Sequence, residues 1–170
     1  MPMRRLWPAR LSWKHCTDST DKGLPVSRIV CPISYSPHPG QVPFHQNRDK
    51  RTRILACGTR FGKDRCTVNE MTPVLVQIAI ERVRNRRVWR DLVPLVHCWV
   101  VAPDYPRLKQ FWRELLFYIP QPMIVSTNES DHSIKLSVTG DGDAQILIEM
   151  KSAKDPSGLV SVGLDLLVMT

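Results

Sequence analysis

The sequence predicts one α/β domain in which helices flank a mainly parallel β-sheet and a β-hairpin is added to that sheet. From residue 35 onward, apolar strand-like segments alternate with segments of helical period, the pattern of a parallel sheet with helical crossovers. Two alternating segments, separated by the turn sequence at residues 139–143, predict the hairpin. The chain of 170 residues, 42% of them hydrophobic, is long enough to bury one sizeable core.

The first elements are read from turn residues and short apolar runs. Residues 1–34 show no clear period, so we expect a loosely ordered N-terminal extension, with the domain itself covering residues 35–170. Residues 41–47 predict a short helix, and residues 53–57 predict a strand that ends at Gly58. A helix is expected over residues 63–71, and Thr72 and Pro73 then predict an N-cap and the first turn of a second helix.

The second half has clearer periods. Residues 95–102 are nearly all apolar and rich in β-branched side chains, as in a strand covered on both faces. Residues 133–138 and 145–151 alternate and form the expected hairpin, and residues 164–169 predict another buried strand. Between them an amphipathic helix, ended by Pro120 and Pro122, is indicated by apolar residues at helical spacing: Leu108, Phe111, Trp112, Leu115, Leu116 and Ile119.

Composition narrows the classes of function. The net charge of +8 makes a polyanionic partner plausible, because Lys and Arg release counterions from a phosphate backbone. The apolar runs are far shorter than the roughly 20 residues that cross a bilayer, and no secretory signal is visible, so neither a membrane partner nor secretion is expected. A disulfide framework or zinc site is disfavoured because no C-x-x-C pair occurs among the five cysteines, which are Cys16, Cys31, Cys57, Cys66 and Cys98.

The sharpest feature is the sequence C-G-T-R-F-G-K-D at residues 57–64, between a predicted strand and a predicted helix. A triphosphate needs inward-facing backbone N–H groups, glycines where a Cβ would collide, and the N-terminus of a helix. Gly58 and Gly62 give this room, and Lys63 can reach the β- and γ-phosphates. The sequence differs from the P-loop pattern G-x-x-x-x-G-K-[ST] at two positions: Cys57 replaces the first glycine, and Asp64 replaces the magnesium-binding hydroxyl.

Two interpretations of these residues stay open at this point. Gly-Lys pairs also occur in ordinary strand-to-helix turns, so the position of the loop carries more weight than its spelling. Asp64 is a candidate ligand for Mg²⁺, directly or through water, but an acidic residue also suits the first turn of a helix without any metal.

The order of several motifs resembles that of phage terminase large subunits, the ATPases that package viral DNA. The resemblance covers residues 35–170, and its first motif, at residues 37–41, is followed by Phe44-His45. The phosphate loop follows, then a strand that ends in Ala102-Pro103, then Ser152-Ala153 and a strand beginning Gly-Leu-Asp. It implies a P-loop NTPase (RecA-like) fold and hydrolysis of ATP with Mg²⁺.

The resemblance also implies roles for individual residues. Gln41 stands where the family has a glutamine that reads the adenine edge, although such a residue is also compatible with an exposed turn. Arg60 stands where the family has an arginine that senses or stabilises the γ-phosphate, and Lys63 would stabilise developing charge beside it. The nucleotide-binding residues expected are Gln41, Cys57, Gly58, Thr59, Arg60, Phe61, Gly62, Lys63, Asp64 and Arg65.

The final strand resembles that of the family's second nucleotide-binding motif. Thr170 would occupy the acidic metal-binding position or its replacement, and the water-activating glutamate would come next, so we expect this 170-residue chain to bind ATP with negligible turnover. The similarity thus suggests the front part of an ATPase domain, without the nuclease domain. Asp165 precedes the apolar run, so a capping role is expected for it rather than catalysis.

The partners implied are double-stranded viral DNA, the portal protein and the small terminase subunit, in the host cell cytoplasm, with a homo-oligomeric ring in the complete motor. Two other functions remain open: a helicase-like nucleic-acid-dependent ATPase, and a non-enzymatic basic DNA-binding remnant. Trp99 and Trp112 are expected in the core. A basic run is compatible with DNA contact or with a cationic helix end, and consists of Arg82, Arg84, Arg86, Arg87 and Arg90.

Overall fold

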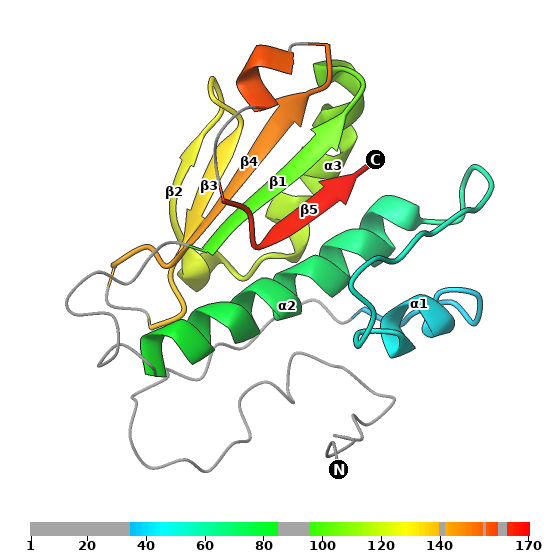
Figure 1. Cartoon of the computed structure of the whole chain (residues 1–170), viewed down its shortest axis with the longest axis horizontal. Helices are drawn as coiled ribbons and strands as arrows, with labels where there is room; N and C mark the ends of the chain where they lie inside the picture. Colours follow the sequence, from blue (N-terminus) through cyan, green and yellow to red (C-terminus); the bar gives the residue numbers. More distant parts are fainter. Residues whose placement is uncertain (1–34, 85–95, 140–141, 155, 160–162) are drawn as a thin grey trace.

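A computed structural model describes residues 35–84, 96–139, 142–154, 156–159 and 163–170 of the chain. Its centre is a five-stranded sheet with the strand order β2-β3-β4-β1-β5 (Figure 1). The strands are β1 (Val96–Ala102), β2 (Ile124–Asn128), β3 (Ser133–Leu136), β4 (Ile146–Ser152) and β5 (Leu166–Met169). The predicted extension at residues 1–34 lies outside the described residues.

The sheet is mixed, as the sequence predicts. Strand β1 pairs in parallel with β4 on one side and with β5 on the other. The expected hairpin is confirmed, because β3 pairs antiparallel with β4 with Ile134 opposite Ile148. Strand β2 was not predicted, because its residues show no apolar alternation. It forms an exposed antiparallel edge beside β3.

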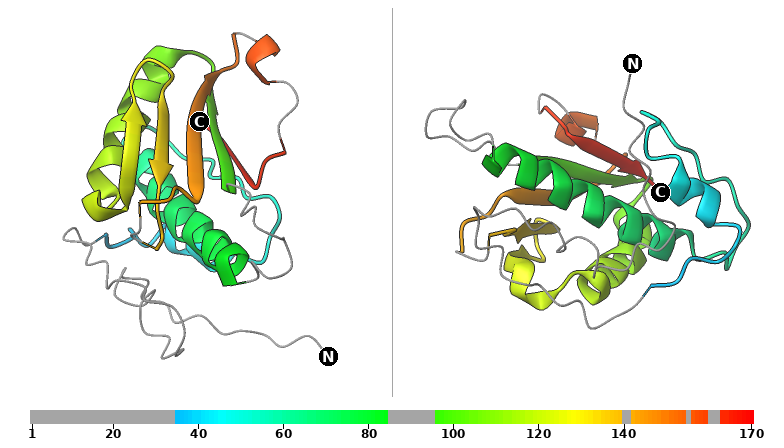
Figure 2. Two further views of the ribbon diagram at one scale, coloured as in Figure 1. Left: turned by 90° about the vertical axis from the view of Figure 1, so that its left-hand side faces the viewer. Right: turned by 90° about the horizontal axis from the view of Figure 1, so that it is seen from below.

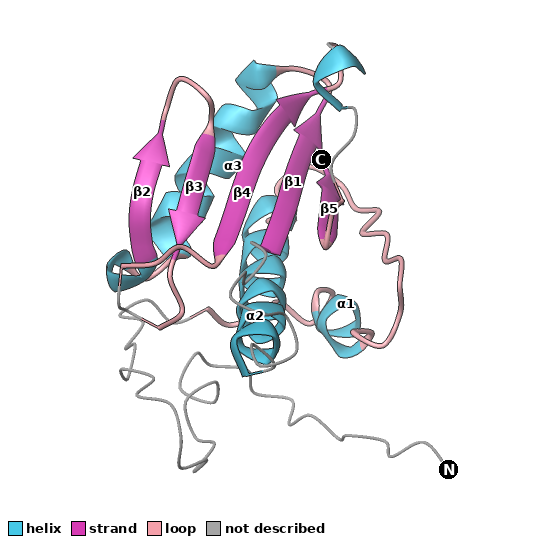
Figure 3. Ribbon diagram, turned by 60° about the vertical axis from the view of Figure 1, so that its left-hand side comes forward, coloured by secondary structure: helices cyan, strands magenta, loops and turns pink. Residues whose placement is uncertain are grey.

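Two long helices cover one face of the sheet. Helix α2 (Lys63–Arg84) and helix α3 (Tyr105–Tyr118) lie behind the strands in the view of Figure 3, and Figure 2 shows the same layer from two other sides. The amphipathic pattern of α3 is confirmed: Leu108, Phe111 and Leu115 are buried against the sheet. The short helix α1 (Val42–Gln46) lies beside the first turns of α2.

The core lies between this helical layer and the facing side of the sheet. Alternate residues of the central strands enter it, among them Cys98 and Val100 of β1 and Ile148 of β4. Trp99 points to the other face but is still only 5% exposed, and its indole nitrogen donates to Glu149 at 2.9 Å. Trp112 is partly buried against the core, so neither tryptophan is a free stacking platform.

Three expectations about the elements are wrong. Residues 53–57 pair with no described strand, and Ile54 in this segment is 85% exposed. No helix boundary occurs at Thr72, because α2 continues through Pro73: buried residues on both sides of this proline, such as Met71 and Leu75, pack against one core. The hydroxyl of Thr72 bonds back to the carbonyl of Val68 at 2.8 Å instead of capping a new helix.

The third correction concerns the last strand, β5, which is an edge strand and not a buried one. It pairs with β1 alone among the described strands, and Leu167 and Met169 are 51% and 78% exposed. Asp165, before it, has the expected capping role. Its carboxylate accepts from the backbone N–H of His97 at 2.9 Å and also binds the guanidinium of Arg82.

Two further groups of residues near these elements can be placed. Asp104 caps α3 by accepting from the N–H of Arg107 at 3.2 Å, which starts the helix directly after β1. At the same edge, Ala102 pairs with Ser152, so the Ala-Pro and Ser-Ala motifs lie together. Of the five arginines in the basic run, only Arg82 has a side chain that the structure describes.

The described residues contain no helix that is both long and apolar enough to cross a membrane.

Candidate functional site

The predicted phosphate loop is a turn between residues 52–57, which form neither helix nor strand, and the start of α2. The start of α2 lies beside the carboxyl end of β5 (Figures 1 and 2). Within the turn, Arg60 has a φ of 65° and Gly62 a φ of 76°. The left-handed region suits glycine, but at Arg60 it costs roughly 1–2 kcal/mol. The strain therefore falls on Arg60, the residue for which the family resemblance implies a contact with the γ-phosphate.

The loop leads without a break into the N-terminus of α2. The helix begins at Lys63, and the N–H of Cys66 donates to the carbonyl oxygen of Gly62 at 2.9 Å. The N–H groups of the first helical turn have no intrahelical acceptor, so those of Lys63, Asp64 and Arg65 can receive an anion. The macrodipole adds partial positive charge at the same point.

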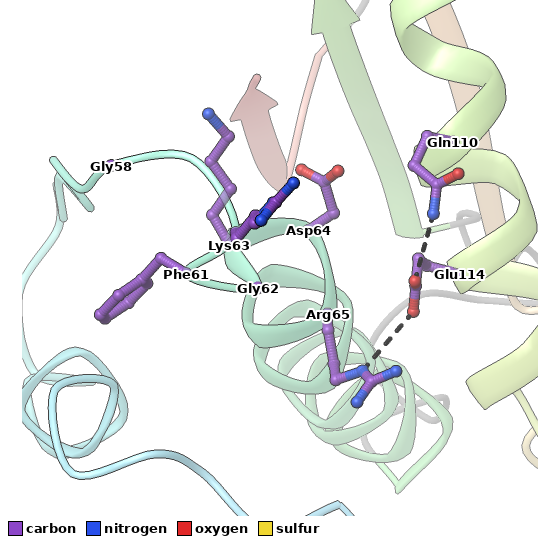
Figure 4. Close-up of a pocket in the computed structure, with 9 residues that line it drawn as sticks. Gly58, Phe61, Gly62, Lys63, Asp64, Arg65, Gln110 and Glu114 are labelled. Carbon is purple, nitrogen blue, oxygen red and sulfur yellow. Dashed lines mark hydrogen bonds and ion pairs between the residues drawn. The ribbon is translucent and has the colours of Figure 1, made fainter.

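A hollow of about 250 Å³ opens at this junction. Figure 4 shows Lys63 extending from the loop, while Arg65 reaches toward α3 and the ring of Phe61 points away, toward α1. Three cations and two carboxylates line the hollow, which gives its lining a net charge of +1. The lining residues are Gly58, Arg60, Phe61, Gly62, Lys63, Asp64, Arg65, Gln110 and Glu114.

Two residues of α3 belong to this lining although the sequence did not point to them. Glu114 lies 3.8 Å from the guanidinium of Arg65 and accepts from the amide of Gln110 at 3.3 Å (Figure 4). Their i, i+4 spacing shows that they share a helix face, but nothing in the sequence indicates that this face meets the loop. Glu114 limits how much positive charge Arg65 can offer a phosphate.

The structure does not bring every predicted residue to the hollow. Cys57 is half-buried just before the loop and Thr59 is exposed, and neither is among the lining residues. Thr170 follows β5, where its N–H donates to the carbonyl oxygen of Val101 at 3.0 Å, and its side chain does not line the hollow.

Gln41 lies behind the loop. It is 4% exposed, so an exposed turn position is excluded for it. The amide nitrogen Nε2 donates to the carbonyl oxygens of Phe61 at 2.9 Å and Gly62 at 3.3 Å. Gln41 therefore contacts the phosphate loop, but it is not among the residues that line the hollow.

A buried ion cluster behind Gln41 was also absent from the sequence prediction. Glu70 of α2 is 2% exposed, and its carboxylate is held by His45 Nδ1 at 2.7 Å, Arg48 Nε at 2.6 Å and Arg53 Nη1 at 2.7 Å. Burial alone would raise the pKa of Glu70, but these hydrogen bonds outweigh it and lower the pKa to about 2. The only hint in the sequence was an acidic residue within an apolar helix face.

Comparison with known proteins supports the fold. The sequence matches no family model and no curated protein. Among solved structures, the chain resembles the ATPase domain of the large terminase of Thermus phage P74-26, with a TM-score of 0.55 and 20% sequence identity. The similarity covers 79% of this chain and 53% of that one, so the chain spans about half the length of that domain. The predicted α/β P-loop architecture is confirmed by this likeness.

Proposed function

We propose that this chain is the ATP-binding portion of a viral DNA-packaging motor, a terminase large subunit that couples ATP hydrolysis to the translocation of DNA into a procapsid. The observation that carries the proposal is the turn at residues 58–62, which runs directly into the N-terminus of α2 and opens a cationic hollow there. The likeness to a phage terminase ATPase domain supports the same conclusion.

The residues of the hollow are suited to a triphosphate. Lys63 supplies a compact charge for the β- and γ-phosphates, and Arg60 supplies a planar guanidinium that can bind phosphate oxygens in a bidentate way. Both side chains belong to exposed residues, so their full charge is available to an entering anion. The N–H groups at the start of α2 add further donors to these two cations.

Asp64 is the residue of the loop that suits Mg²⁺. Magnesium takes oxygen ligands and usually keeps several waters, so one carboxylate together with phosphate oxygens meets its needs. Bound magnesium would neutralise charge on the β- and γ-phosphates. Thr170 lies outside the lining, and its role as a metal ligand stays a prediction.

Calorimetric titration with Mg-ATP tests the nucleotide site. We expect binding by the unsubstituted chain, at least tenfold weaker binding by Lys63→Ala, and no change for Lys109→Ala, an exposed lysine of α3. Equal affinities for the two lysine variants would contradict the assignment of the loop.

Double-stranded DNA is the proposed polymer substrate. For the complete motor we propose the portal protein and the small terminase subunit as partners. We also propose that the motor is a homo-oligomeric ring in the host cytoplasm. DNA binding should weaken steeply with salt and persist in Lys63→Ala. If DNA binds while ATP does not, the chain is a basic DNA-binding remnant. A helicase-like ATPase would be favoured by DNA unwinding in a longer version of the protein.

A further inference from the structure

The side-chain amide of Gln41 has all of its hydrogen-bonding capacity in use. Its oxygen accepts from the hydroxyl of Tyr35 and from the backbone N–H of His38, both at 2.9 Å. Its nitrogen donates to the carbonyl oxygens of Phe61 and Gly62. A primary amide offers two donors and two acceptor sites, so no group remains for a ligand.

The two carbonyl oxygens that Gln41 holds belong to consecutive peptide units of the phosphate loop. In a planar trans peptide the C=O and the N–H point in opposite directions. When the carbonyl of Phe61 points back to Gln41, the N–H of Gly62 points the other way, and the carbonyl of Gly62 directs the N–H of Lys63 in the same manner. Gly62 and Lys63 line the hollow and Gln41 does not.

We propose that Gln41 is a positioning residue for the phosphate loop: by holding the carbonyls of Phe61 and Gly62, it aims the N–H groups of Gly62 and Lys63 at a bound triphosphate. This inference rests on the proposed nucleotide site. It differs from recognition of the adenine edge, for which Gln41 would have to leave four hydrogen bonds and a buried position.

Gln41 is itself anchored to α2 through a chain of polar contacts. The hydroxyl of Tyr35 lies 3.0 Å from His45 Nε2, and His45 Nδ1 lies 2.7 Å from the Glu70 carboxylate. Burial raises the pKa of Tyr35, so its hydroxyl keeps the proton that it donates to Gln41. The position of the loop carbonyls is therefore tied to a buried carboxylate one helical turn beyond Cys66.

Positioning of the loop and recognition of adenine predict different effects of a Gln41 substitution on affinity. Only recognition of adenine makes the effect depend on the base of the ligand. We would measure by calorimetry the affinities of the full chain and of Gln41→Met for Mg-ATP, Mg-GTP and inorganic tripolyphosphate, which has no base. A positioning role predicts that Gln41→Met weakens all three by a similar factor, about tenfold, because the N–H groups contact phosphate alone. Gln46→Met, an exposed glutamine at the end of α1, is the matched control and should change none.

Thermal unfolding would show whether Gln41→Met folds. If it does not fold, a second variant tests the same inference. Tyr35→Phe keeps the ring and removes the hydroxyl that orients Gln41, so it should weaken the three ligands by a common, smaller factor. The inference is overturned if either variant loses affinity for ATP while tripolyphosphate binds normally, or if neither changes any affinity. If the unsubstituted chain binds none of the three, the proposed function itself is overturned.

Discussion

Arg53 Nη1 donates to Glu70 Oε1 at 2.7 Å, and this contact joins the segment before the phosphate loop to the middle of α2. The same guanidinium donates to the carbonyl oxygen of Phe44 at 3.2 Å and lies 5.0 Å from the centre of its ring. Residues 53–57 pair with no described strand, so side-chain contacts take over the anchoring that a sheet would provide.

Glu70→Gln should lower the free energy of unfolding by about 3 kcal/mol or more, because breaking a buried ion pair leaves the partner charges uncompensated. Chemical denaturation would measure this change. The control is Glu81→Gln on the exposed side of the same helix, expected to change the stability by no more than about 0.5 kcal/mol. Equal, small effects of both variants would show that the cluster does not stabilise the fold.

The stability should also depend on pH through Glu70. The pKa of this carboxyl is about 2 in the folded chain against an ordinary 4.5, so its contribution is complete above pH 4.5. That contribution, on the order of 3 kcal/mol, is lost as the pH falls from 4.5 to about 2. Urea unfolding at a series of pH values should show this loss in the unsubstituted chain and a shallower one in Glu70→Gln.

At the position of Arg60, glycine should give a more stable protein than alanine. Because its φ of 65° is left-handed, Arg60→Gly should be more stable than Arg60→Ala by about 1 kcal/mol. The order should reverse at Arg113, an exposed position within α3, where alanine is better than glycine by about 1 kcal/mol. Thermal unfolding of the four variants checks both orders, and an alanine preference at position 60 would exclude backbone strain there.

Gly40 leaves room for the ring of Phe61. A Cβ at this position would lie 3.0 Å from Phe61 Cε2, so Gly40→Ala should displace the ring and lower the stability by roughly 1–3 kcal/mol. Gly163→Ala is the control, since its Cβ would have no neighbour within 4 Å. Binding of Mg-ATP should weaken in Gly40→Ala and not in Gly163→Ala. A neutral Gly40→Ala would mean that Phe61 adjusts without moving the loop.

Periodicity predicted the elements that bury one continuous face. Strand β1, helix α3 and the β3–β4 hairpin were expected at nearly their observed positions, because their apolar residues recur at strand or helix spacing. The interpretation of Thr72-Pro73 as the start of a helix failed, because packing against the core keeps α2 continuous despite the missing N–H of Pro73. The strand prediction for residues 53–57 also failed, since an apolar run does not show whether a neighbouring strand is present to pair with it.

The candidate site was predictable only where its residues are consecutive. The phosphate loop could be found because Gly58, Gly62 and Lys63 are close in sequence and precede a helix. Glu114 and Glu70 come from other turns of helices, and their contacts with Arg65 and Arg53 depend on how the helices pack. The hydrogen bonds from Gln41 to the phosphate loop were equally hidden, because the two carbonyl groups that accept them lie 20 and 21 residues away.

The half-buried thiol of Cys57 gives the phosphate loop a built-in chemical reporter. Burial raises the pKa of Cys66 and of Cys98, which makes both poor nucleophiles, whereas Cys57 borders Gly58 and is partly open to solvent. With Cys16 and Cys31 replaced by serine, the rate of modification by a thiol reagent would follow the loop at a single atom. A triphosphate that orders the loop would then be seen as a slower reaction, without any label added to the nucleotide.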